Sequence, residues 1–293
     1  MDKRFEVGGF CFRLCCPDGL APANLMKFAA DAPEEEEYTY RMIEAETLPL
    51  PAGDCLARRE DAEIYAAPAG EARLLGARGV PGWLACYEEV SPREARIVLA
   101  PGWRPRFAGV DTAFTGLLAL ERRVLPLGGL VLHCAFADWE GEALLFSGPS
   151  GIGKSTQAGL WQKYRGARIL NGDRALLLPG PEGWTAGGWP VCGSSEICFN
   201  QRRKLRAIVL PTQETENFAR RLRPAAAFAA LYGQVTVNRW NPTACARAAD
   251  LLEQLCRSVP VWRLGCTISQ NAVDCLAAAL AEEGGARHET PNP

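Results

Sequence analysis

Residues 143–156 read ALLFSGPSGIGKST, and this stretch decides which fold the chain is expected to have. Within it, residues 148–155 match the pattern G-x-x-x-x-G-K-[ST], a glycine-rich loop that ends in a lysine and a hydroxyl residue. The apolar residues 143–147 predict a strand before the loop, and residues 157–164 predict a helix after it. A loop between these two elements is typical of a phosphate-binding site. The alternative is a glycine-rich turn with an ordinary surface lysine.

Each residue type in the loop suits phosphate chemistry. The glycines allow the backbone to bend so that successive N–H groups point toward phosphate oxygens. The lysine brings a positive charge to the β- and γ-phosphates, the serine hydroxyl is placed to bind magnesium, and the N-terminal helix dipole favours the anion. We therefore expect ATP and Mg²⁺ as cofactors. The expected contacts are Gly148, Ser150, Gly151, Ile152, Gly153, Lys154, Ser155 and Thr156.

A carboxylate is also needed, to hold the metal and to activate an acceptor, and Asp173 is the candidate. It follows the short apolar run 168–170, within the sequence Asn171-Gly172-Asp173-Arg174. A carboxylate at a strand end beside a nucleotide can bind magnesium, as Ser155 can, or accept the proton of an acceptor hydroxyl. Asn-Gly-Asp is also common turn chemistry, so a turn aspartate is the alternative. The position directly after the next strand favours the functional interpretation.

Residues 144–177, LLFSGPSGIGKSTQAGLWQKYRGARILNGDRALL, resemble the nucleotide-binding core of HPr kinase/phosphorylase. That family shares its fold with ATP-dependent phosphoenolpyruvate carboxykinase. The resemblance covers roughly residues 128–265 and leaves residues 1–110 unexplained. It implies an α/β kinase core with a mixed sheet, ATP-dependent phosphoryl transfer, and a histidine on the strand upstream of the loop.

The resemblance assigns further candidate residues. The upstream histidine corresponds to His133 in VLHCAFADWEGEALLFSG, although a histidine satisfied within a strand is the alternative. The family's paired aspartates correspond to Gly172-Asp173, so only Asp173 carries over. Its later signature, Glu-hydrophobic-Arg-Gly, corresponds to residues 196–199, where Glu196 is the matching acid and the arginine and glycine are missing. A helix or turn cap is the alternative for Glu196.

Composition excludes several classes of protein. The 293 residues carry a formal net charge of −2, so no basic field attracts nucleic acid or an anionic membrane. The sequence has no apolar run long enough for a membrane helix and no signal-peptide core. The twelve cysteines form no CxxC pair and only two histidines are present, so free thiols in a cytoplasmic protein are expected rather than disulfides or a zinc site.

The pattern along the chain predicts two domains. Short strand-length runs, broken by proline and glycine, predict a mostly β domain at 1–105, suited to peptide docking. A kinase core is predicted at 106–283 and a flexible tail at 284–293. The predicted function is transfer of the γ-phosphoryl group of ATP to a hydroxyl, with a serine of a peptide or protein as acceptor, as in peptide natural-product maturation. A small-molecule kinase and a nucleotide-sensing binding protein are the alternatives, and a homo-oligomer is left open.

Overall fold

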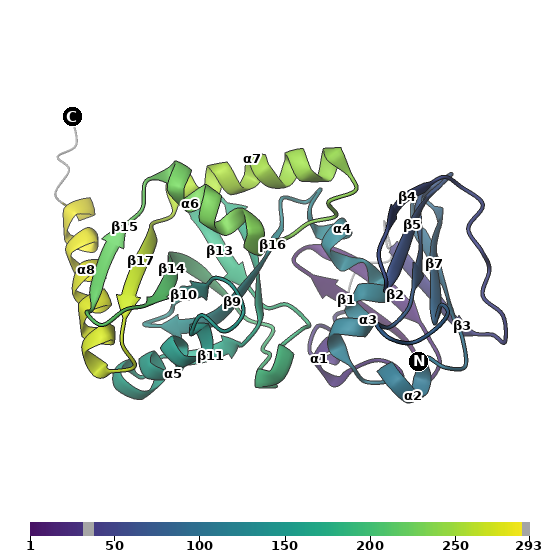
Figure 1. The fold of residues 1–293 in the computed structure, drawn as a ribbon, viewed down its shortest axis with the longest axis horizontal. Helices are drawn as coiled ribbons and strands as arrows, with labels where there is room; N and C mark the ends of the chain where they lie inside the picture. Colours follow the sequence, from purple (N-terminus) through teal and green to yellow (C-terminus); the bar gives the residue numbers. More distant parts are fainter. Residues whose placement is uncertain (32–37, 289–293) are drawn as a thin grey trace. The chain divides into compact units, whose positions relative to one another are not determined.

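The computed structural model describes residues 1–31 and 38–288. The chain divides into two compact units, each with its own mixed β-sheet (Figure 1). Unit 1 comprises Met1–Leu127 and Asn238–Pro242, and unit 2 comprises Gly128–Val237 and Thr243–Pro293. Within the described residues, no helix is long and apolar enough to cross a membrane.

Unit 1 is built on an eight-stranded sheet in the order β1-β2-β3-β8-β7-β6-β5-β4. Its first hairpin turns at Gly8 and Gly9, whose φ angles of 61° and 88° are those that a tight two-residue hairpin loop requires. The pairs β2–β3 and β3–β8 are parallel, and the others are antiparallel. The strands are β1 (Asp2–Val7), β2 (Phe10–Cys15), β3 (Tyr38–Glu44), β4 (Cys55–Arg58), β5 (Ala62–Ala67), β6 (Gly70–Leu75), β7 (Ala85–Ser91) and β8 (Glu94–Leu99).

The helices after β8 belong to unit 1, so the first segment of unit 1 extends to Leu127, beyond the boundary at residue 105 that the sequence predicted. Phe114 and Leu117 of the third helix are fully buried. The hydroxyl of Tyr40 on β3 donates a hydrogen bond to the carbonyl oxygen of Leu118 at 2.6 Å. The apolar face of this helix therefore packs within unit 1. The helices are α1 (Ala23–Met26), α2 (Arg104–Phe107), α3 (Asp111–Leu118) and α4 (Leu120–Val124).

A buried group of charged side chains joins the segment Asn238–Pro242 to unit 1. Arg73 donates to Glu71 at 2.6 Å and to Glu121 at 3.2 Å. The indole N–H of Trp240 donates to Glu71 at 3.2 Å. With its amide oriented to satisfy both neighbours, Asn238 donates to Glu121 and accepts from Arg73, each at 3.0 Å. Because buried charges are stable only when paired and hydrogen-bonded, this network fixes the segment to unit 1.

Unit 2 is built on a nine-stranded sheet. Strand β9 pairs with β10 and with β12, β12 pairs with β13, β13 with β14, and β14 returns to β10, so these pairings close into a ring. Strands β17 and β15 extend the sheet from β14. The strands are β9 (Leu130–Trp139), β10 (Glu142–Ser147), β11 (Arg168–Asn171), β12 (Arg174–Gly180), β13 (Gly183–Gly187), β14 (Arg202–Gln213), β15 (Phe218–Arg221), β16 (Val235–Thr236) and β17 (Val261–Cys266).

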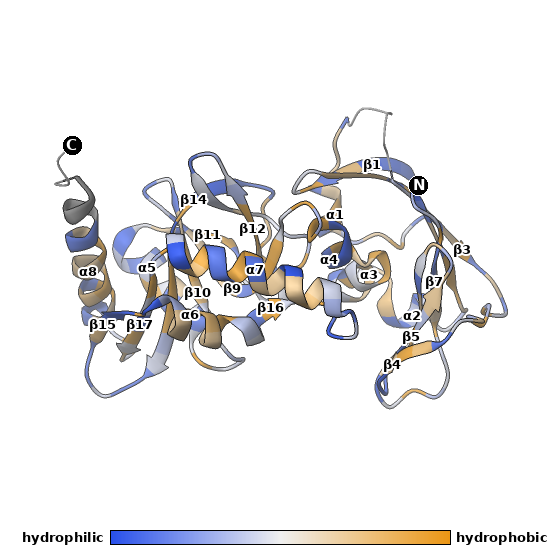
Figure 2. Ribbon diagram, turned by 90° about the horizontal axis from the view of Figure 1, so that it is seen from above, coloured by the Kyte–Doolittle hydropathy of each residue, from blue (hydrophilic) through white to orange (hydrophobic). Residues whose placement is uncertain are grey.

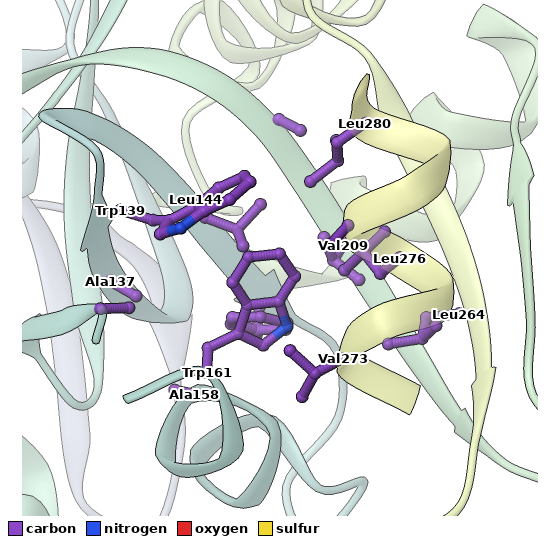
Figure 3. Close-up of a cluster of buried hydrophobic side chains, with 14 of the residues drawn as sticks. Ala137, Trp139, Leu144, Ala158, Trp161, Val209, Leu264, Val273, Leu276 and Leu280 are labelled. Atoms are coloured by element: carbon purple, nitrogen blue, oxygen red, sulfur yellow. The ribbon is translucent and has the colours of Figure 1, made fainter. Parts of the chain in front are cut away.

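The core of unit 2 lies between this sheet and two helices. Trp161 of α5 is fully buried and packs edge-on against Trp139 of β9, with ring centroids 4.7 Å apart. Figure 3 shows Trp161 beside Leu144 of β10 and Val273 of α8. α7 alternates hydrophobic and hydrophilic residues along its length (Figure 2) and buries one face. The helices are α5 (Lys154–Arg165), α6 (Pro224–Leu231), α7 (Pro242–Ser258), α8 (Gln270–His288), and the short 3₁₀ helices η1 (Gly193–Ser195) and η2 (Tyr232–Gln234).

Most of the expected elements are present. The two large mixed sheets confirm the mixed α/β class. None of the twelve cysteines, all of which lie within the described residues, forms a disulfide. Residues 284–288, predicted as part of a flexible tail, continue α8, and residues 289–293 lie outside the described residues. Strand β6 lacks the usual sequence signal of a strand, because its buried Glu71 and Arg73 interrupt the apolar alternation by which strands are recognised.

We expect the substitution Arg73→Met to destabilise unit 1 by about 3–5 kcal/mol, since it removes a buried cation that pairs with the carboxylates of Glu71 and Glu121. The measurement is urea-induced unfolding.

The matched control is Arg96→Met. Arg96 forms an ion pair with Glu88 at 2.6 Å, but on the surface, so its removal is expected to cost less than about 1 kcal/mol. Equal losses in the two variants would contradict a structural role for the buried network.

Candidate functional site

The glycine-rich loop runs from the end of β10 to the start of α5 and has the bent backbone that the sequence predicted. Gly151 and Gly153 have φ angles of 80° and 108°, which residues with a side chain rarely adopt. α5 begins at Lys154, and its first intrahelical hydrogen bond joins the N–H of Gln157 to the carbonyl oxygen of Gly153 at 2.9 Å. The N–H groups of the preceding helical residues have no acceptor within the helix, and they are therefore available to an anion.

Lys154 is held close to this loop. Its side chain is only 8% exposed, and its ammonium group donates to the carbonyl oxygens of Gly148 and Pro149, each at 2.9 Å. Burial lowers the pKa of the Lys154 ammonium, and the charge of Asp173 opposes this shift. Ser155 and Thr156, the next two residues of α5, are exposed. The lysine thus lies along the loop, and the two hydroxyl residues face solvent.

Asp173 lies in the turn between β11 and β12. Because β12 pairs with β9 with Arg174 opposite His133, the turn brings Asp173 next to the histidine. The carboxylate oxygen Oδ1 lies 3.7 Å from Nε2 of His133, and Oδ2 accepts a hydrogen bond from Nε of Arg174 at 3.0 Å. Arg174 also donates to the hydroxyl of Thr236 at 2.7 Å. The carboxylate is therefore held between two side chains from neighbouring strands.

The surroundings of His133 favour its neutral form. Burial lowers the pKa of the His133 ring, the positive charge of Lys154 lowers it further, and Asp173 acts in the opposite direction. Nδ1 lies 3.4 Å from the side-chain oxygen of Gln234. A neutral imidazole beside Asp173 adds no positive charge next to Lys154.

A cavity of about 270 Å³ brings most of the predicted residues together. Its lining consists of His133, Ser150, Gly151, Gly153, Lys154, Ser155, Thr156, Gly172, Asp173, Ser194 and Ser195. Three predicted residues do not line it. Gly148 is buried and Ile152 is partly buried. Glu196 is exposed and ends η1 with a left-handed φ of 58°, which agrees with the turn-cap alternative.

The volume of this cavity does not identify it as the functional site. A concavity of about 520 Å³ near Asp2 and Arg13, and another of about 450 Å³ between α6 and α7, are larger. Neither brings a glycine-rich loop, a lysine and a carboxylate together. The chemistry of the lining residues therefore identifies the site.

The sequence did not indicate that η1 forms one side of the cavity. The main-chain N–H of Gly172 donates to the carbonyl oxygen of Ile197 at 3.4 Å, and the hydroxyl of Ser195 donates to the carbonyl oxygen of Cys192 at 2.7 Å. These bonds place Ser194 and Ser195 in the cavity. The sequence 193–195, Gly-Ser-Ser, is ordinary turn chemistry, and it contains no signal that the segment meets the Asp173 turn.

The cavity fits a nucleotide phosphate and a magnesium ion. The loop supplies N–H donors and Lys154 supplies positive charge, while Ser155 and Asp173 supply oxygen ligands. Within residues 1–31 and 38–288, no group of three or more His, Cys, Asp and Glu side chains is placed to hold a metal. Mg²⁺ does not require such a group, because it keeps several waters and binds through one or two protein ligands plus substrate phosphates.

Comparison with solved structures finds matches to part of the chain. No protein-family model matches the chain, and no curated protein matches it. The chain aligns with the solved structure of the HPr(Ser) kinase/phosphatase from Coxiella burnetii, with 12% sequence identity and a TM-score of 0.29, over 54% of this chain and 92% of that chain. That structure bears the name of the family that residues 144–177 resemble. At this identity and TM-score, no substrate or residue role carries over to this chain.

Gly172 is required by the close approach of η1. A Cβ atom at this position would lie 2.0 Å from the hydroxyl oxygen of Ser195. We expect Gly172→Ala to destabilise unit 2 by about 1–3 kcal/mol, because η1 must move away. Denaturant unfolding measures this loss.

Gly159→Ala is the control, since Gly159 lies inside α5 and a Cβ atom there would meet nothing within 4 Å. This variant is expected to stabilise unit 2 by about 0.5–1 kcal/mol. A stabilising effect of Gly172→Ala would contradict the packing of η1 against the turn.

The lowered pKa of His133 predicts a pH dependence of stability. Between the lowered pKa and the ordinary value, the unfolded chain binds a proton that the folded chain does not. The free energy of unfolding should therefore fall as the pH decreases through this window. The variant His133→Asn should lack this part of the pH dependence, as measured by urea unfolding at a series of pH values. An identical pH dependence in both proteins would contradict the assignment.

Proposed function

We propose that this protein is an ATP- and Mg²⁺-dependent kinase that transfers the γ-phosphoryl group to a hydroxyl. The observation that carries the proposal is that Lys154, Ser155 and Asp173 line one cavity at the start of a helix. Phosphoryl transfer requires positioning and charge neutralisation more than covalent chemistry, so a cation, a metal ligand and a carboxylate are sufficient.

Each group has a defined task in this proposal. Lys154 and the N–H groups at the start of α5 bind the phosphates. When bound, Mg²⁺ supplies positive charge to the phosphate oxygens, and Ser155 and Asp173 are the residues that would hold it. Asp173 also accepts the proton of the acceptor hydroxyl, as a general base. His133 and Arg174 keep the carboxylate in place from its two sides.

For the acceptor, we propose a serine of a peptide or protein. The resemblance of residues 144–177 to HPr kinase/phosphorylase supports this class. The lining residues Ser155, Thr156 and Ser194 are exposed, so an acceptor can approach the cavity from the solvent. In this proposal, unit 1 serves as the docking element for the peptide.

The test compares Lys154→Ala with Asp173→Asn. Lys154→Ala should weaken Mg²⁺–ATP binding by at least about tenfold and abolish transfer, because it removes a charge-assisted contact. Asp173→Asn should lower the transfer rate by on the order of 10²-fold or more, with a much smaller change in ATP affinity at saturating magnesium. Calorimetric titration measures affinity. Transfer of labelled phosphate to serine-containing peptides measures the rate.

Lys163→Ala is the matched control, because Lys163 is an exposed lysine on the same helix and packs over Tyr164. It should bind ATP as the wild type does. Unchanged ATP binding in Lys154→Ala would refute the assignment of the loop. A wild-type protein that binds ATP, hydrolyses it slowly and phosphorylates nothing is a nucleotide sensor, and one that phosphorylates only small molecules is a small-molecule kinase.

A further inference from the structure

Asn171 is a fully buried polar residue at the end of β11, two residues before Asp173. Its side-chain NH₂ donates to the carbonyl oxygens of Trp189 and Val191, each at 3.0 Å. Its side-chain oxygen accepts from the main-chain N–H groups of Asp173 and Arg174, each at 2.9 Å. Both donors and both acceptor positions of the amide are therefore in use.

The two accepted hydrogen bonds fix the backbone of the Asp173 turn. An asparagine side chain that accepts from the N–H groups two and three residues ahead closes a turn in place of a backbone carbonyl. The carbonyl oxygen of Asp173 accepts from the main-chain N–H of Cys134 on β9 at 2.9 Å. With its N–H and its carbonyl both bonded, the Asp173 backbone is held from two directions.

The two donated hydrogen bonds fix the opposite wall of the cavity. Trp189 and Val191 precede η1, which carries Ser194 and Ser195 into the cavity. A Cβ atom on Gly193 would lie 3.1 Å from Oδ1 of Asp173, so the start of η1 touches the carboxylate. The side-chain amide of Asn171 thus sets the distance between the carboxylate of Asp173 and the two serines of η1.

We propose that Asn171 is a positioning residue for phosphoryl transfer, because its hydrogen bonds hold Asp173 and η1 at a fixed distance from each other. This role rests on the proposed kinase function. The other side chains of similar size cannot replace it. An aspartate offers no donor when ionised, and leucine offers neither donor nor acceptor. None of the four hydrogen bonds of the Asn171 side chain goes to the glycine-rich loop. We therefore expect Asn171 to affect the rate of transfer and not the binding of ATP.

The test is a double-mutant cycle that combines Asn171→Ala with Asp173→Asn. Mg²⁺–ATP turnover to ADP, with water as the acceptor, is measured together with KM for ATP and the melting temperature. Asn171→Ala should lower kcat by on the order of 10²-fold, the usual effect of displacing a catalytic group by about 1 Å, with KM nearly unchanged. In the Asp173→Asn background, Asn171→Ala should cause little further loss, because it acts through that carboxylate.

Leu170→Ala is the matched control. Leu170 is the neighbouring residue on β11 and is also fully buried, so this variant should lower the melting temperature and keep its kcat. If Asn171→Ala does not fold, Asn171→Ser, which has a single hydroxyl in place of the amide, takes its place in the cycle with the same expected coupling.

The outcomes separate this role from the kinase function itself. If the wild type turns over ATP and Asn171→Ala keeps its kcat, the positioning role is refuted while the kinase function stands. Losses that multiply in the double variant refute the role in the same way, because independent effects add in free energy. A wild type that neither hydrolyses ATP nor phosphorylates any of the serine-containing peptides refutes the kinase function, and the role of Asn171 falls with it.

Discussion

The site depends on strand β9, which pairs with β10 on one edge and with β12 on the other, in addition to its shorter pairings with β11 and β16. On one edge Cys134 pairs with Ser147, the last residue before the glycine-rich loop, and on the other edge His133 pairs with Arg174, the residue after Asp173. Neighbouring strands lie about 4.8 Å apart, so this register alone brings the loop and the carboxylate within about 10 Å of each other. A shift of the register by one residue would turn His133 to the other face of the sheet and separate it from Asp173.

Both units bury polar side chains whose hydrogen bonds are made. In unit 1, Glu71 and Arg73 hold the segment Asn238–Pro242, and in unit 2, Asn171 holds the Asp173 turn. A buried polar group without partners is costly, so such networks allow few alternative arrangements of the backbone. The same physical constraint therefore holds a distant chain segment to unit 1 and the Asp173 turn in unit 2.

The charges of the site are balanced by their neighbours. Asp173 lies between the cation of Arg174 and the neutral ring of His133, whose pKa is lowered mainly by burial and then by Lys154. Lys154 is itself turned toward the carbonyl oxygens of its own loop. This arrangement keeps a carboxylate and an ammonium group in one cavity without pairing them directly, so each is available to a ligand.

The sequence alone determined the glycine-rich loop, the strand and helix on its two sides, and Asp173 as the candidate carboxylate, because these depend on local residue types and short spacings. Only the tertiary structure decided that His133 lies beside Asp173, that Ser194 and Ser195 line the cavity, and that Glu196 does not. The tertiary structure also decided that the first segment of unit 1 extends to Leu127. The reason is that strand register and the partners of buried polar groups join residues far apart in the chain, and no local pattern records such contacts.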